Sequence, residues 1–150
     1  MKKFKFSLDS VLSYKQQVLD ALKGEHAAIL AEVRAQEDVV EAAWRAYRDC
    51  NDEFCRRKME GMIVSDAVFY ETGLRVLERD IQRETDKLDA LRKKEERKRR
   101  EVVDAKIDTS SIEKLKEHKL EDYNKAVQKA EENLIDEFVS SARARAGIGA

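Results

Sequence analysis

Apolar residues recur along this chain at steps of three, four or seven positions, the spacing of one face of an α-helix. A first stretch of this kind runs from about Leu8 to Phe54, and a second runs from about Phe69 to Phe138. The sequence contains no proline, the residue that most strongly breaks helices. The pattern therefore predicts two long helices, one over about residues 8–59 and one over about residues 65–142.

Between the two stretches, the segment from Glu60 to Ser65 holds residues suited to end one helix and begin another. Gly61 can adopt the left-handed backbone that terminates helices, and serine, here Ser65, is favoured at a helix N-cap. A turn at about residues 60–64 would bring the two helices together as antiparallel neighbours. The expected fold is all-α, an antiparallel two-helix coiled-coil hairpin with a longer second helix. It forms a single domain over residues 1–150 with a frayed tail at 143–150.

Part of the second predicted helix should extend past the first. With the turn near Met62, facing residues have numbers that sum to roughly 126, which places Leu8 opposite His118. The step from Ile112 to Leu120 is one residue longer than a heptad, which predicts a stutter there. About two dozen residues then overhang as a lone amphipathic helix that should need a partner. The apolar stripe of this overhang consists of Leu120, Tyr123, Val127, Leu134 and Phe138.

Composition narrows the function classes. Charged residues make up 41% of the chain, the net charge is −1, and the two signs are interleaved, as is typical of coiled coils. A two-helix seam encloses no catalytic pocket, so an enzyme is disfavoured and no catalytic residue, cofactor or metal is predicted. Cys50 and Cys55 point to different sides of one helix and cannot bridge locally, which favours a reduced, cytosolic protein. No segment reaches the ~18 apolar residues that span a bilayer.

Aromatic residues gather in two places, and large rings contribute much of the binding energy at protein interfaces. One group lies near the predicted turn and the other at the open end of the hairpin. Trp44 widens its apolar stripe beyond what a two-helix seam needs, so we expect it at the surface. The first group is Trp44, Tyr47, Phe54, Phe69 and Tyr70, and the second is Phe4, Phe6, Tyr14, Tyr123 and Phe138.

Two other functions fit parts of the pattern. The run from Arg92 to Arg100 could contact nucleic-acid phosphates, although acidic residues interrupt it and no aromatic residue is interleaved for base stacking. A solvated helical face is the simpler interpretation, because the hairpin would place this run opposite Glu25, Glu32, Glu37 and Asp38. A generic scaffolding or tethering coiled coil that homodimerises is the second alternative.

Several features together resemble the FliJ family of the bacterial flagellar export apparatus. They are the basic start leading into Phe4–Leu12, a nearly uninterrupted helix, a turn with Gly61, a second helix opening at Phe69, and the closing sequence Asp136-Glu137-Phe138. The resemblance covers the whole chain. It implies a small, non-enzymatic, cytoplasmic protein that is peripherally associated with the inner face of the cell membrane.

The resemblance also implies partners. The family resembles the stalk of rotary ATPases, docks in the hexameric flagellar export ATPase, contacts the cytoplasmic domain of the export gate membrane protein, and is linked to escorting export chaperones. No nucleic-acid partner is implied. We expect the overhanging stripe from Leu120 to Phe138 to contact the ATPase. Family gate contacts lie near the turn, and Leu77 and Tyr47 match that pattern, although Gly73, Asp80 and Glu84 depart from it. With Trp44, the surface aromatic residue near the turn, they are the gate-contact candidates.

Overall fold

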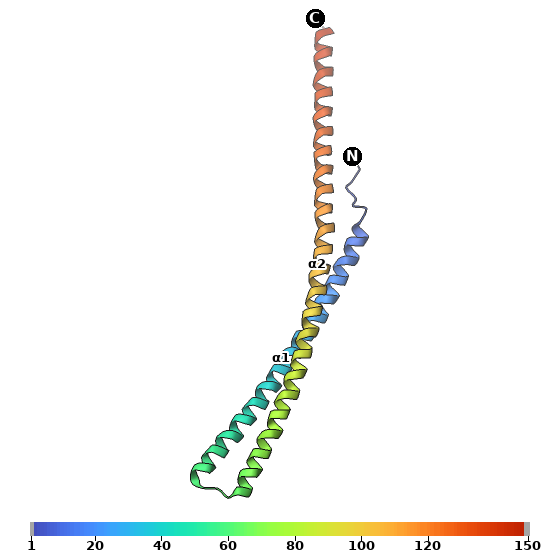
Figure 1. Cartoon of the computed structure of the whole chain (residues 1–150). Coiled ribbons are helices and arrows are strands. Elements are labelled where there is room, and N and C mark those ends of the chain that lie inside the picture. Colours follow the sequence, from blue (N-terminus) through green and yellow to red (C-terminus); the bar gives the residue numbers. More distant parts are fainter. Residues whose placement is uncertain (1, 149–150) are drawn as a thin grey trace. The chain divides into compact units, whose positions relative to one another are not determined.

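The computed structural model describes residues 2–148 and consists of two helices (Figure 1). Helix α1 spans Asp9–Glu60 and helix α2 spans Val64–Ile148, with 52 and 85 residues respectively. The predicted all-α, antiparallel two-helix coiled-coil hairpin with a longer second helix is confirmed.

The reversal between the helices depends on Gly61. Its φ is +95°, a backbone conformation that residues with a Cβ rarely adopt, and its N–H donates to the Lys58 carbonyl at 3.4 Å. The Ala67 N–H then donates to the Ile63 carbonyl at 3.2 Å, which starts α2. Ile63 therefore occupies the N-cap position, and the expectation that Ser65 caps α2 is wrong, because Ser65 already lies in the first helical turn.

Helix α2 continues past the end expected near residue 142 and reaches Ile148. The segment from Ala142 to Ala146 alternates alanine and arginine, two of the best helix formers, so it stays helical although its apolar pattern has been lost. The last two residues of the expected frayed tail, 149–150, lie outside the described residues.

The chain divides into two compact units, one formed by Met1–Leu19 with Ala105–Ala150 and the other by Asp20–Asp104. In the second unit, Ile29, Val33 and Leu88 form a buried cluster on which Val40 and Leu91 pack. Burying this apolar seam stabilises the pairing of the two helices.

Ion pairs across the same unit show the antiparallel register. Glu25 contacts Lys98 at 2.8 Å, Glu32 contacts Lys94 at 3.8 Å, and Glu37 contacts Arg92 at 3.1 Å. Residue numbers rise along α1 while they fall along α2, and each pair sums to a value close to the expected 126. The predicted placement of the basic run opposite Glu25, Glu32 and Glu37 is therefore confirmed.

Polar side chains interrupt this seam in pairs. The Gln36 amide donates to a Glu84 carboxylate oxygen at 2.7 Å and to the Glu84 carbonyl at 3.0 Å. This hydrogen bond, with the nearby Lys87 and Arg83 cations, holds the pKa of Glu84 below its ordinary value. Polar pairs of this kind fix one register of a coiled coil at some cost in stability.

In the unit formed by residues 1–19 and 105–150, the seam passes residues 112–120 without a stutter. Thr109, Lys116 and Tyr123 follow one another at heptad spacing, and all three are buried or half-buried, whereas Leu120 is exposed. Lys116 keeps the phase because its stem lies in the seam while its ammonium pairs with Asp9 at 2.7 Å. The predicted stutter is wrong, because it treated Leu120 as a seam residue in place of Lys116.

Candidate interaction surfaces

The three gate-contact candidates lie in one neighbourhood of the Asp20–Asp104 unit. The Trp44 and Tyr47 rings meet edge to face with centroids 6.1 Å apart. The Tyr47 hydroxyl donates to a Glu78 carboxylate oxygen at 3.4 Å, which ties it to the residue after Leu77. Tyr47 and Leu77 are half-buried in the seam, whereas 44% of Trp44 is exposed. Trp44 thus has the most accessible side chain of the three, as the sequence predicted.

The other aromatic residues near the turn have a structural role. Phe54 and Tyr70 stack with ring centroids 5.3 Å apart, and the Lys58 ammonium lies 3.8 Å from the centre of the Phe54 ring. Partial burial raises the pKa of Tyr70, and the hydrogen bond that its hydroxyl donates to Glu53 at 3.1 Å adds to this effect. This cluster holds the two helices together about two helical turns from Gly61.

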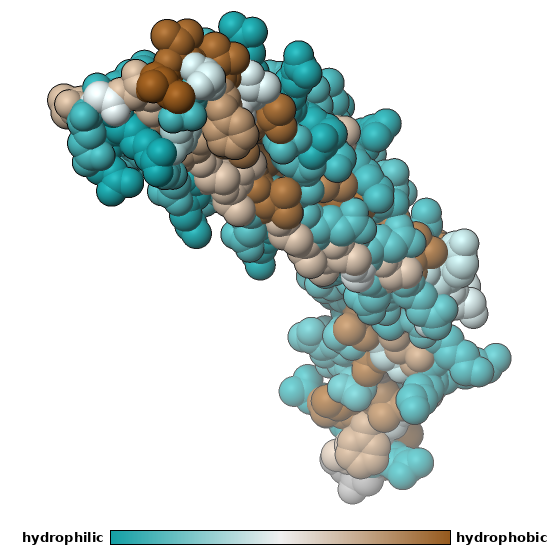
Figure 2. Space-filling model, turned by 90° about the horizontal axis from the view of Figure 1, so that it is seen from below, coloured by the Kyte–Doolittle hydropathy of each residue, from teal (hydrophilic) through white to brown (hydrophobic). Residues whose placement is uncertain are grey.

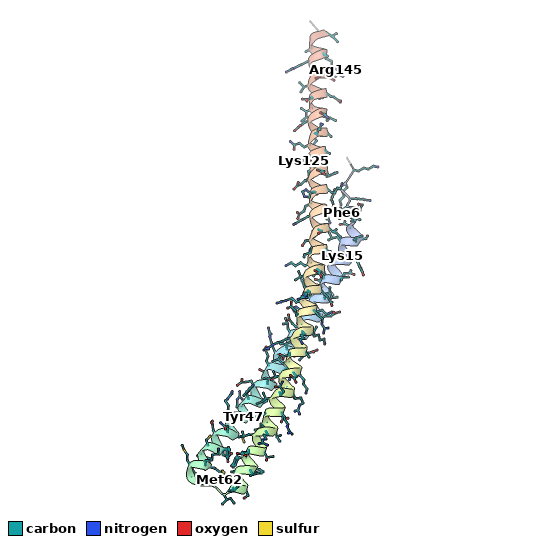
Figure 3. All side chains as sticks on the ribbon, in the orientation of Figure 1. Phe6, Lys15, Tyr47, Met62, Lys125 and Arg145 are labelled. Atoms are coloured by element: carbon teal, nitrogen blue, oxygen red, sulfur yellow. The ribbon has the colours of Figure 1, made fainter. Side chains whose placement is uncertain are left out.

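Of an exposed apolar patch at the turn, the sequence pattern had indicated Phe69 but not its four aliphatic neighbours. Five side chains there each expose more than half of their surface. Figure 2 is seen from below, and the nearest part of the molecule, where the turn lies, carries a group of hydrophobic side chains. Figure 3 labels Met62 in the turn and Tyr47 further along α1. The patch residues are Met59, Ile63, Val64, Val68 and Phe69.

The basic run on α2 is largely paired. In addition to the contacts of Arg92, Lys94 and Lys98 with α1, Arg99 and Arg100 both pair with Glu96. Hydrogen bonds to Glu101 and Glu25 raise the pKa of Lys98, which stays charged within its acidic surroundings. These contacts support the view that the run is a helical face neutralised within the fold, and they weaken the case for a phosphate-binding surface.

The ATPase-contact candidates on α2 divide into covered and open residues. Residues 2–7, which we call the N-terminal arm, precede α1 without helical structure, and Phe4 of this arm packs on Tyr123 with ring centroids 5.5 Å apart. Tyr123 and Val127 are half-buried, whereas Leu120, Leu134 and Phe138 are exposed, the last two by 69% and 75%.

The arm accompanies α2 as far as Tyr123, but because α2 reaches Ile148, about two dozen residues still extend past the arm, as expected. Beyond Tyr123 the exposed apolar surface of α2 is wider than predicted. Ile135 and Val139 are exposed beside Leu134 and Phe138. Their positions directly after two stripe residues were the available signal in the sequence. We call these four residues the open stripe.

Side chains that could bind a metal ion or take part in catalysis are dispersed over the described residues. Within residues 2–148, no cluster of three or more histidine, cysteine or acidic side chains could hold a metal ion. His26 pairs with Glu95 at 2.8 Å inside the seam, and Cys50 and Cys55 are free thiols. Over the described part of the chain, neither helix has a stretch long and apolar enough to cross a membrane.

Comparison with known proteins gives one match. The family model described as flagellar FliJ protein matches residues 4–147, which is nearly the whole chain. The chain matches no curated relative and no solved structure.

Proposed function

The chain belongs to the flagellar FliJ family and is a component of the flagellar export apparatus, and from this premise we propose that it is a non-enzymatic stalk. In this proposal it docks in the hexameric export ATPase, stimulates that enzyme, and links it to the cytoplasmic domain of the export gate membrane protein. It acts in the cytoplasm, peripherally associated with the inner face of the cell membrane, and export chaperones are further partners.

The observation that carries the proposal is the open stripe on α2. Leu134, Ile135, Phe138 and Val139 are exposed next to one another on a single helix, and soluble proteins seldom leave such contiguous apolar surface in water. The part of α2 that carries this stripe is a single helix about 10 Å across, narrow enough to enter the channel of a ring-shaped hexamer. The open stripe would then be covered by the inner wall of the ATPase.

The proposed stimulation of the ATPase follows from the asymmetry of the docked helix. A single α-helix inside a ring of six subunits presents its apolar face to some subunits and its charged face to others. Subunits that bind this helix in one nucleotide state more tightly than in another have their equilibrium shifted toward that state, by as much as the difference in affinity. The chain would in this way change ATP turnover without contributing a catalytic group.

We assign gate contact to Trp44, Tyr47 and Leu77. Trp44 supports this role best, because its ring is accessible and is braced by Tyr47, so little conformational freedom is lost when a partner covers it. Tyr47 and Leu77 are half-buried and would act mainly by holding the surface in shape. The ATPase and gate surfaces thus belong to different units of the chain.

Two variants with opposite expectations test both assignments. The double variant Leu134→Ser/Phe138→Ser should weaken binding to the purified export hexamer by about tenfold or more and remove the increase in ATPase activity. Its binding to the gate domain should be unchanged. Trp44→Ala should weaken binding to the gate domain and leave binding to the hexamer and the ATPase stimulation unchanged. Val39→Ala, at a similarly exposed position on α1, is the control.

Both interactions are measured by surface plasmon resonance on the full-length chain, together with ATPase rates with and without it. If the wild-type chain neither binds the hexamer nor changes its rate, the proposed function is wrong. If the double variant binds the hexamer as well as the wild type does, the open stripe is not the docking surface.

A further inference from the structure

The N-terminal arm is held against α2 by alternate residues. Phe6 is buried and half-buried Phe4 packs on Tyr123, whereas Lys3 and Lys5 are exposed, as expected for an extended segment with one face on a surface. The Tyr123 hydroxyl donates to the Lys2 carbonyl at 2.8 Å. Figure 3 shows Phe6 in the arm, close to α2.

The arm covers the beginning of the same face that is open further along α2. Tyr123, Val127, Leu134 and Phe138 follow one another at steps of four, seven and four residues, so they lie along one side of the helix. The first two are half-buried and the last two are exposed. A partner that covers the open stripe and extends toward Tyr123 would meet the arm.

We propose that the N-terminal arm is a releasable strap that occupies part of the ATPase-docking face, and that docking of the hexamer displaces it. This inference rests on the proposed function of the open stripe. Coverage by the arm explains why Tyr123 is less exposed than Leu134 and Phe138 in the free protein. Docking is then conditional on release of the arm, because the arm and the hexamer compete for Tyr123.

The contacts of the arm are suited to release. Its ring-to-ring contact with α2 is Phe4 on Tyr123, and one hydrogen bond from Tyr123 fixes its backbone at Lys2. Phe6 anchors the other end next to the first turn of α1, where the Asp9 N–H donates to its carbonyl at 3.2 Å. The arm can therefore swing away from Tyr123 about Phe6 while the Asp9–Lys116 ion pair keeps α1 in place.

The test is Phe4→Ala in the full-length chain. Removing the ring that covers Tyr123 should raise the fraction of molecules with an open docking face and tighten binding to the purified export hexamer by about three- to tenfold. Phe69→Ala, the same truncation of an exposed ring in the other unit, should leave this affinity unchanged. Unchanged or weaker binding of Phe4→Ala would overturn the proposal, because the arm would then be inert or part of the docking surface.

Trypsin cleavage after Lys3 and Lys5, followed by mass spectrometry, gives a second measurement. A strap predicts faster cleavage in Phe4→Ala than in the wild type, and faster cleavage of the wild type once the hexamer is bound. Equal cleavage of the two free proteins, or protection by the hexamer, would overturn it. If the wild type fails to bind the hexamer, the proposed function fails, and the comparison of the two free proteins still decides whether the arm is docked.

Discussion

Glycine-to-alanine substitutions at Gly61 and Gly24 should change stability in opposite directions. Both added methyl groups would enter open space, since a Cβ at either position would have no neighbouring side chain or facing helix within 4 Å. The two sites differ in backbone conformation, because Gly61 has a φ of +95° in the turn whereas Gly24 lies inside α1. Side-chain packing therefore contributes to neither stability change, and the difference between the two substitutions measures the effect of backbone conformation.

The magnitudes follow from that conformation. An L-residue with a positive φ loses about 1–2 kcal/mol, so Gly61→Ala should destabilise the protein by this amount. Gly24→Ala should stabilise it by about 0.5–1 kcal/mol, because alanine loses less conformational freedom than glycine in a helix. For a chain of this length, each kcal/mol corresponds to about 2–4 °C in Tm.

The assay is urea and thermal unfolding, followed by circular dichroism at the helix band for the wild type and both variants. The predicted order of stability is Gly24→Ala above wild type above Gly61→Ala. A stabilising effect of Gly61→Ala, similar to that of Gly24→Ala, would mean that residue 61 is helical in solution, and the turn would be refuted.

Three further predictions concern the Asp20–Asp104 unit. Leu88→Ala should cost about 2–5 kcal/mol in urea unfolding, whereas the same change at the more exposed Leu115 should cost far less; equal losses would contradict the assigned seam. The lowered pKa of Glu84 stabilises the fold above the ordinary value of 4.5, and this contribution disappears as the pH falls through the folded pKa. Glu84→Gln should therefore be less stable than the wild type at neutral pH, with a difference that narrows on acidification; a pH-independent difference would exclude this coupling. Spin labels at residues 37 and 92 in a cysteine-free background should lie within about 25 Å of each other, against about 80 Å for one continuous helix.

Much of the fold could be predicted because the apolar residues that pair the two helices recur in the sequence at helical spacing. The position of Gly61 fixes the register, and the register then correctly places the acidic residues Glu25, Glu32 and Glu37 opposite the basic run. The predicted stutter was wrong because a polar residue occupied a seam position. Counting apolar residues cannot recognise that Lys116 lies in the seam with its charge paired to Asp9.

The candidate surfaces were harder to predict, because exposure depends on what covers a side chain. The stripe from Leu120 to Phe138 is visible in the sequence, but its division into covered and open parts depends on a non-helical arm. That arm has only Phe4 and Phe6 to mark its inward face, too short an alternation to be distinguished from chance. The aliphatic residues of the exposed patch at the turn were missed for a related reason, since apolar residues near a turn are expected to pack.

Photo-cross-linking at residue 138 tests the central claim, that the open stripe of α2 meets the export ATPase. The Phe138→benzoylphenylalanine variant keeps an aromatic side chain at this exposed position, and it is irradiated in a mixture of the purified hexamer and the gate domain. We predict that mass spectrometry will find cross-links from residue 138 to the ATPase, whereas the same group at position 44 reacts with the gate domain. Cross-links from residue 138 to the gate domain, with none to the ATPase, would contradict the account.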